Sequence, residues 1–146
     1  MKPTQKLPVK DIGIMHIILA LAFLFESAVA WNVSQEIRER WIRDASPYYS
    51  ECICESGSDI TKSINILGKL EYPNDACLKC FMKCVEFKMG LILSDGTIVP
   101  EAWVRKVAAV TPEIARKCTD ETNGTLDTCQ KAYDWSQCLV AAVSYN

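Results

Sequence analysis

Apolar residues recur every three or four positions along most of the chain, a spacing that places side chains on one face of an α-helix. The clearest example lies between Asn32 and Tyr49, where apolar positions are separated by charged residues. The same spacing predicts helices over residues 59–68, 74–90, 101–109, 111–118 and 126–143. No long stretch alternates strictly between apolar and polar residues. The pattern therefore predicts an all-α fold of about six helices.

Local signals mark several helix boundaries. Pro47 is expected to break or kink the first helix, because proline lacks the amide hydrogen that a helix interior needs. Asp59 is a suitable N-cap for the second helix, and Gly90 is a suitable stop for the third. Thr111 followed by proline is a typical helix start, so the fifth helix is expected to begin there.

Two of these helices have faces that spacing alone assigns to the interior. In residues 59–68 the inward positions are predicted to be Ile60, Ile64 and Leu67. In residues 74–90 the shared inner face is predicted to carry Cys77, Cys80, Cys84 and Phe87. Cysteines four residues apart on a helix are held too rigidly to bond each other, so this helix is expected to be joined to different neighbours.

The first 30 residues have the organisation of a secretory signal peptide. Three lysines precede an apolar stretch over residues 12–25, and residues 28–30, Ala-Val-Ala, have the small-x-small form of a cleavage site. About 14 apolar residues are too few to span a bilayer core of about 30 Å as a helix. We therefore expect residues 1–30 to be removed and residues 31–146 to form one secreted domain.

The charged residues of this mature chain argue against several classes of function. Removal of the leader leaves 13 basic and 16 acidic side chains, a net charge of −3, and the basic residues form no stripe. Nucleic acid is therefore not expected as a partner. The one histidine, His16, lies in the leader, so the mature chain has no Ser/His or Cys/His pair for nucleophilic catalysis. We expect no enzymatic activity and no cofactor.

All eight cysteines belong to the mature chain: Cys52, Cys54, Cys77, Cys80, Cys84, Cys118, Cys129 and Cys138. An even set in a small secreted domain is typical of disulfides, here four, although the count alone leaves their pairing open. The alternative is a metal site that uses the CxxC at Cys77 and Cys80. No second CxxC and no histidine complete such a site. We therefore expect disulfides and no metal.

The order and spacing of the cysteines resemble those of the insect odorant-binding and pheromone-binding proteins. The resemblance rests on Cys80-x3-Cys84, on the ten residues between Cys118 and Cys129, and on the eight residues between Cys129 and Cys138. It also includes the start Cys52-x3-Ser56-Gly57 and the stretch from Gly90 to Gly96. The resemblance covers essentially the whole mature chain, but the 33 residues between Cys84 and Cys118 are a short interval for this family.

The resemblance implies three interlocked disulfides, Cys52–Cys84, Cys80–Cys129 and Cys118–Cys138. Cys54 and Cys77 are additional to the six cysteines of the family, and they would be left to pair with each other. Whether Cys52 or Cys54 pairs with Cys84 stays open. The fold that the resemblance implies is a set of helices around a hydrophobic cavity.

A ligand cavity in so small a domain needs compensating stability. Four disulfides raise the free energy of unfolding by on the order of 10 kcal/mol, whereas an empty apolar cavity of about 300 Å³ lowers it by roughly 7 kcal/mol. The candidate lining residues are Ile66, Leu67, Met82, Leu91, Ile92, Leu93, Ile98, Trp103, Val107, Ala115, Tyr133, Ser136, Leu139, Val140 and Val143. Each is equally compatible with ordinary core packing. Tyr133 and Ser136 are the polar members expected to orient a ligand hydroxyl or carbonyl group.

The resemblance implies a secreted carrier for odorants or pheromones, which would deliver them through sensillum lymph or a similar fluid to a membrane chemoreceptor. The carrier is expected to be a monomer or a weak homodimer. Because the mature chain has no histidine, pH-triggered release would depend on carboxylates, below about pH 5 unless burial raises their pKa. The alternative is a secreted, disulfide-rich effector or inhibitor-like protein with a filled core.

Overall fold

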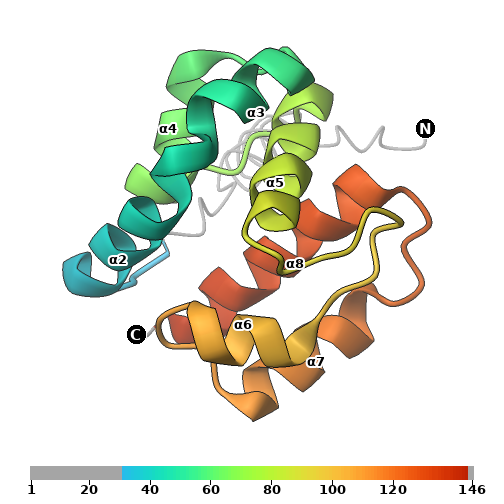
Figure 1. The fold of residues 1–146 in the computed structure, drawn as a ribbon. Coiled ribbons are helices and arrows are strands. Elements are labelled where there is room, and N and C mark those ends of the chain that lie inside the picture. Colours follow the sequence, from blue (N-terminus) through green and yellow to red (C-terminus); the bar gives the residue numbers. More distant parts are fainter. Residues whose placement is uncertain (1–30, 145–146) are drawn as a thin grey trace, which may run out of the picture. The chain divides into compact units, whose positions relative to one another are not determined.

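The computed structural model describes residues 31–144, so the predicted signal peptide lies outside the described residues (Figure 1). Within this range the chain forms seven α-helices and one short 3-10 helix, with the labels of Figure 1: α2 (Gln35–Ala45), η1 (Ser46–Tyr48), α3 (Tyr49–Ser56), α4 (Ile60–Gly68), α5 (Ala76–Lys88), α6 (Pro100–Lys106), α7 (Pro112–Thr122) and α8 (Thr128–Val143). The β pairing in these residues is one isolated antiparallel bridge, between Ile92 and Ile98. The all-α prediction is confirmed.

The helix predicted over residues 32–49 is divided at Pro47. Helix α2 ends at Ala45, and Pro47 lies in the first turn of η1, where its missing amide hydrogen breaks no helical bond. Helix α3 then follows and ends at Gly57, whose φ of 68° suits a residue without a Cβ. The division at Pro47 was predicted, and α3 is the helix that the sequence pattern did not separate.

Side-chain caps begin four of the other helices. Asp59, Asp75, Thr111 and Asp127 each accept a hydrogen bond from the backbone N–H three residues further on. The four donor–acceptor distances lie between 2.7 and 3.3 Å. Each cap satisfies an amide that has no partner inside its helix. The predicted starts at Asp59 and Thr111 are confirmed.

Buried apolar side chains form two clusters. The first, the tryptophan cluster, surrounds Trp103 and Trp135, whose rings stack with centroids 3.7 Å apart. The second, the Phe81 cluster, surrounds Phe81 on α5 and includes Ile66 and Leu78. Leu67, Tyr72 and Met89 pack against both clusters. These three residues therefore mark a seam where the two halves of the core meet.

Three disulfides tie the helices together, with the pairing that the resemblance implies. They are Cys52–Cys84 between α3 and α5, Cys80–Cys129 between α5 and α8, and Cys118–Cys138 between α7 and α8. Helices α5 and α8 also form the most extensive helix pair, and they cross near the middle of the domain (Figure 1). The expectation that residues 74–90 join different neighbours is met by α5.

The expected bond between Cys54 and Cys77 is not present, and both thiols are exposed and unpaired in the described structure. Cys54 follows Cys52 by two residues on α3, which is about 200° around the helix axis. Because Cys52 faces α5, Cys54 is directed away from α5 and from Cys77 on that helix. The structure thus pairs Cys52, and not Cys54, with Cys84.

Both inner faces assigned from spacing are correct only in part: Cys84 on α5 is buried and Leu67 on α4 packs against both clusters, as predicted. On α5, Cys77 is exposed and Phe87 is 45% exposed, whereas the buried face carries Leu78, Phe81, Met82, Val85 and Glu86. On α4, Ile60 and Ile64 are 62% and 53% exposed, and the buried residues are Ser63 and Ile66. Both sides of α4 carry isoleucine, so periodicity could not decide between them. None of the helices within residues 31–144 has the length and apolar content to cross a membrane.

Candidate ligand-binding cavity

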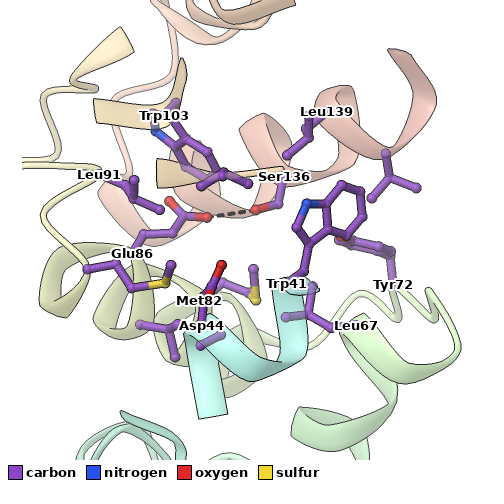
Figure 2. Close-up of a pocket in the computed structure, with 15 residues that line it drawn as sticks. Trp41, Asp44, Leu67, Tyr72, Met82, Glu86, Leu91, Trp103, Ser136 and Leu139 are labelled. Atoms are coloured by element: carbon purple, nitrogen blue, oxygen red, sulfur yellow. Dashed lines mark hydrogen bonds between the residues drawn. The ribbon is translucent and has the colours of Figure 1, made fainter. Parts of the chain in front are cut away.

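A cavity of about 50 Å³ lies at the seam between the two clusters (Figure 2). Its walls come from α2, α4, α5, α6 and α8 and from the segments that follow α4, α5 and α6. The lining residues are Trp41, Asp44, Ala45, Leu67, Tyr72, Met82, Val85, Glu86, Met89, Leu91, Trp103, Val107, Ser136, Leu139 and Val140. Among these, Asp44 alone is exposed, so the cavity meets solvent near the C-terminal end of α2.

The cavity is smaller than the 300 Å³ expected from the sequence. Pockets that enclose drug-sized ligands have volumes of about 300–1,000 Å³. The side chains of Trp41, Trp103, Met82 and Leu139 converge on this space, and the two indole rings fill part of it (Figure 2). A larger ligand therefore requires lining side chains to move.

Eight of the fifteen predicted lining residues do line the cavity: Leu67, Met82, Leu91, Trp103, Val107, Ser136, Leu139 and Val140. Seven do not: Ile66, Ile92, Leu93, Ile98, Ala115, Tyr133 and Val143. Ile66 is buried inside the Phe81 cluster, and Leu93 is 51% exposed in the loop after α5. Ile92 and Ile98 pair in the isolated bridge, and Ala115 and Val143 belong to the tryptophan cluster.

Tyr133, one of the two polar residues predicted to orient a ligand, has a different role. Its hydroxyl group donates a hydrogen bond to the carbonyl oxygen of Pro73 at 2.8 Å. Its ring meets that of Tyr72 edge to face, with centroids 5.4 Å apart. Tyr133 therefore holds the segment between α4 and α5 against α8, and in doing so places Tyr72 at the cavity wall.

Seven lining residues were not predicted: Trp41, Asp44, Ala45, Tyr72, Val85, Glu86 and Met89. Trp41 and Ala45 lie on the apolar face that the first helix displays in the sequence, so that face was the signal for them. Glu86 follows Leu78 and Met82 at intervals of four residues, so it continues the buried stripe of α5. A charged residue in an apolar stripe is the sequence signal that could have identified it.

Hydrogen bonds hold two tryptophan rings, Trp41 at the cavity wall and Trp135 behind it, whereas the indole N–H of Trp103 has no partner among the described residues. The Trp41 indole N–H donates to the carbonyl oxygen of Ala108 at 2.9 Å, which ties α2 to the segment after α6. The Trp135 N–H donates to the Thr119 hydroxyl group at 3.2 Å. Trp103, which lines the cavity, stacks on Trp135. The rings are thus held in place from outside the cavity.

Glu86 is the buried titratable residue in this lining. It is 2% exposed, and its Oε1 accepts a hydrogen bond from the Ser136 hydroxyl group at 2.7 Å (Figure 2). Its Oε2 has no hydrogen-bond partner among the described residues. Burial raises the pKa of Glu86 well above its usual value of 4.5, and the hydrogen bond from Ser136 offsets only part of this rise. Glu86 is therefore a neutral carboxylic acid over a pH range where exposed glutamates are ionised.

Tyr72 is a second buried polar group at the cavity wall. Its hydroxyl group has no hydrogen-bond partner among the described residues, and burial raises its pKa. The proximity of Glu86 adds to that rise, so the two side chains influence each other across the cavity. The raised pKa of each group favours its protonated form, which can donate an O–H hydrogen bond.

These features define a small helical domain with three disulfides and an internal, mostly apolar cavity. The family model of the PBP/GOBP family matches residues 34–142, and the chain belongs to this family. The family consists of odorant-binding carriers and not of enzymes, and its members are secreted proteins that bind small hydrophobic ligands. The recognition made from the cysteine spacing is confirmed. No curated protein sequence matches the chain.

Two solved structures have a similar fold. The odorant-binding protein dmelOBP28a from Drosophila melanogaster is 17% identical with a TM-score of 0.56, and the match covers 73% of this chain and 94% of that one. Odorant Binding Protein 7 from Anopheles gambiae is 23% identical with a TM-score of 0.53, and the match covers 70% of this chain and 85% of that one. The second structure is described as having four disulfide bridges and as being in complex with an azo compound. Both similarities are at the level of the fold.

Proposed function

We propose that this chain is a secreted carrier that binds small hydrophobic molecules in the cavity between its two apolar clusters. The observation that carries the proposal is the cavity itself. Its lining is apolar except for Asp44 at the mouth and for Tyr72, Glu86 and Ser136 on the wall. An apolar pocket with a few polar groups in fixed positions is the usual form of a small-molecule site. Membership of the PBP/GOBP family supports the same function.

A ligand of odorant size needs more room than about 50 Å³, and the lining contains side chains that can provide it. Met82 and Met89 are unbranched, so they change shape at lower cost than branched residues do. Met89 and Leu67 are partly exposed and pack against both clusters. Small movements at the seam would therefore enlarge the cavity while the disulfides keep the helices joined.

The proposal includes a route for the ligand. Residues 1–30 would direct the chain to the secretory pathway and be removed, and the mature carrier would act in an extracellular fluid such as sensillum lymph. It would carry its ligand, as a monomer or weak homodimer, to a membrane chemoreceptor. In this role the protein keeps a poorly soluble molecule dissolved in the fluid and catalyses no reaction.

Displacement of a fluorescent apolar probe tests the proposal. The mature protein, residues 31–146, should bind N-phenyl-1-naphthylamine with a micromolar Kd, and octanal or a similar odorant should displace it. Val140→Phe adds bulk at a buried lining position, so it should weaken probe binding at least tenfold. Leu93→Phe makes a comparable change at an exposed position outside the lining and should leave the Kd unchanged.

The small cavity also favours a second candidate, an extracellular interaction protein with a filled core. In that case the folded mature protein would not bind the probe, or the Val140→Phe and Leu93→Phe variants would bind it with the same Kd. Either result would reject the carrier function for this cavity.

A further inference from the structure

Glu86 is an unusual component for an apolar cavity. The side chain enters the cavity from α5, and its carboxyl group lies among Leu91, Trp103 and Ser136 (Figure 2). No lysine, arginine or histidine belongs to the described lining. The titratable groups that share the lining are Tyr72, from the segment before α5, and Asp44, from α2. Neither of them supplies a positive charge.

A structural role does not account for this carboxyl group. Buried polar groups that serve the fold are nearly always fully hydrogen-bonded, because an unpaired buried polar atom is costly. Glu86 has one hydrogen bond, from Ser136, and its Oε2 is unpaired among the described residues. An apolar side chain of similar length, such as methionine, would fill the same place without this cost. The acid therefore requires another explanation.

Three buried polar groups of the lining are unpaired among the described residues: Oε2 of Glu86, the Tyr72 hydroxyl group and the Trp103 indole N–H, and the first two can act as O–H donors. Ser136 donates to Oε1, which leaves Oε2 as the atom that carries the proton of the neutral acid. The Tyr72 hydroxyl group is buried and unpaired as well. A carbonyl oxygen has two lone pairs and can accept such hydrogen bonds, whereas a hydrocarbon can accept none.

We propose that Glu86, positioned by Ser136, recognises a hydrogen-bond acceptor on an otherwise apolar ligand, and that the ligand class is that of ketones, aldehydes and esters. The acceptor oxygen takes the hydrogen bond from Oε2–H, and the Tyr72 hydroxyl group is the second donor available to it. The inference rests on the proposed function, because it requires that ligands enter the cavity. It names the ligand chemistry that the cavity selects.

An ammonium group is the competing ligand, since it would pair with an ionised Glu86. That pair would require the removal of two charges from water, and Ser136 is the one side chain seen to hydrogen-bond the carboxylate. Buried ion pairs with so few additional hydrogen bonds gain little or nothing over neutral partners. The geometry therefore favours the neutral acceptor over the cation.

Three ligands of matched size test the inference: acetophenone, its hydrocarbon analogue cumene, and 1-phenylethylamine. Their Kd values are measured by displacement of N-phenyl-1-naphthylamine from the mature protein and its variants at pH 6. Glu86→Met should raise the Kd for acetophenone about 5- to 10-fold, which corresponds to the loss of one hydrogen bond. The Kd for cumene should change by no more than about twofold. Glu86→Gln keeps an N–H donor at the same place and should retain most of the acetophenone affinity. Melting curves confirm that each variant is folded.

Ser63→Ala is the control, because it alters a buried polar group outside the cavity. It should leave the ratios among the Kd values of the three ligands unchanged. If the probe binds but Glu86→Met weakens acetophenone and cumene equally, the inference is wrong while the carrier function stands. If the amine binds best and Glu86→Gln abolishes that binding, the site is a cation site and the inference is also wrong. If the probe does not bind at all, the proposed function fails first.

Discussion

Two of the regions that bury polar side chains, the corner between α3 and α4 and the cavity, differ in how completely their polar atoms are paired. Between α3 and α4, the Ser63 hydroxyl group lies 2.9 Å from the carbonyl oxygen of Asp59 and 3.0 Å from the hydroxyl oxygen of Ser58. In the cavity, Glu86 is bonded to Ser136 through one oxygen and unpaired at the other. The first region is satisfied by the fold, whereas the second is not.

In the first region the polar groups fix the course of the chain, whereas in the second an unpaired polar atom faces the cavity. Ser58 and Ser63 lie where α3 ends and α4 begins, and their hydrogen bonds fix that corner. Glu86 lies in the last turn of α5, and its carboxyl group caps no backbone group of that helix. Its incomplete pairing coincides with a cavity, which is where an incoming molecule could complete it.

The largest expected effect is on the pH dependence of stability. The pKa of Glu86 is raised in the folded state, so the folded protein keeps a proton that the unfolded chain releases above about pH 4.5. The free energy of unfolding should therefore fall by about 1.4 kcal/mol per pH unit from that pH up to the folded pKa. Below pH 4.5 this contribution is fully present. Glu86→Gln removes the slope, and urea unfolding of both proteins at pH 5, 6 and 7 measures the difference.

Glu101→Gln, a change at an exposed glutamate on α6, is the matched control and should leave the slope as it is in the unmodified protein. Parallel stability curves for the unmodified protein and Glu86→Gln would show that Glu86 is ionised inside the cavity. The comparison between the two buried polar regions would then have to be abandoned.

The second effect concerns the paired region. Ser63→Ala should lower the free energy of unfolding by about 1–2 kcal/mol, because Ser58 loses its buried partner. Neither serine titrates, so the loss should be the same at pH 5 and pH 7. Chemical denaturation at both values checks this, and a loss that varies with pH would indicate coupling to the cavity.

The third effect is that of Ser136 and depends on its partner. Ser136→Ala should cost about 1 kcal/mol, because Glu86 loses its hydrogen bond. In a Glu86→Met background the same change should cost close to nothing. Unfolding of the four proteins of this double-mutant cycle gives the coupling directly. Equal costs in both backgrounds would show that the hydrogen bond does not contribute to stability.

The smallest effect is expected on the surface, which gives the baseline for both buried regions. Cys54 and Cys77 are exposed and unpaired, so replacing both by serine should change the free energy of unfolding by less than about 0.5 kcal/mol. A thiol reagent should react with two thiol groups per folded chain. A loss of 2–4 kcal/mol and no reactive thiols would instead reveal a fourth disulfide.

The sequence predicted most of the fold because its boundary signals are local. Asp59 and Thr111 cap their helices through atoms three residues away, and Pro47 acts on its own turn, so no tertiary information is needed. The buried face of α4 was assigned wrongly, because it depends on the hydrogen bonds that let Ser63 be buried while Ile60 is exposed. Such partners are defined only when the chain is folded.

About half of the candidate site could be predicted for a related reason. Met82, Leu139 and Val140 follow from helical spacing, which identifies buried positions in general. Whether a buried residue faces a cavity or a packed cluster depends on how separate helices meet, and Ile66 shows that an equally buried residue can be outside the site. Glu86 was missed because a glutamate is normally assigned to the surface.

The empty space at the seam also has a mechanical consequence. Unfolding eliminates internal voids, and the decrease in the volume of the system scales with the void volume, here a cavity of about 50 Å³. Hydrostatic pressure therefore shifts the unoccupied protein toward unfolding. A molecule that fills the void removes part of this volume change and makes the domain more resistant to compression. A ligand bound there, as we propose, would tighten the core beyond what the disulfides alone achieve.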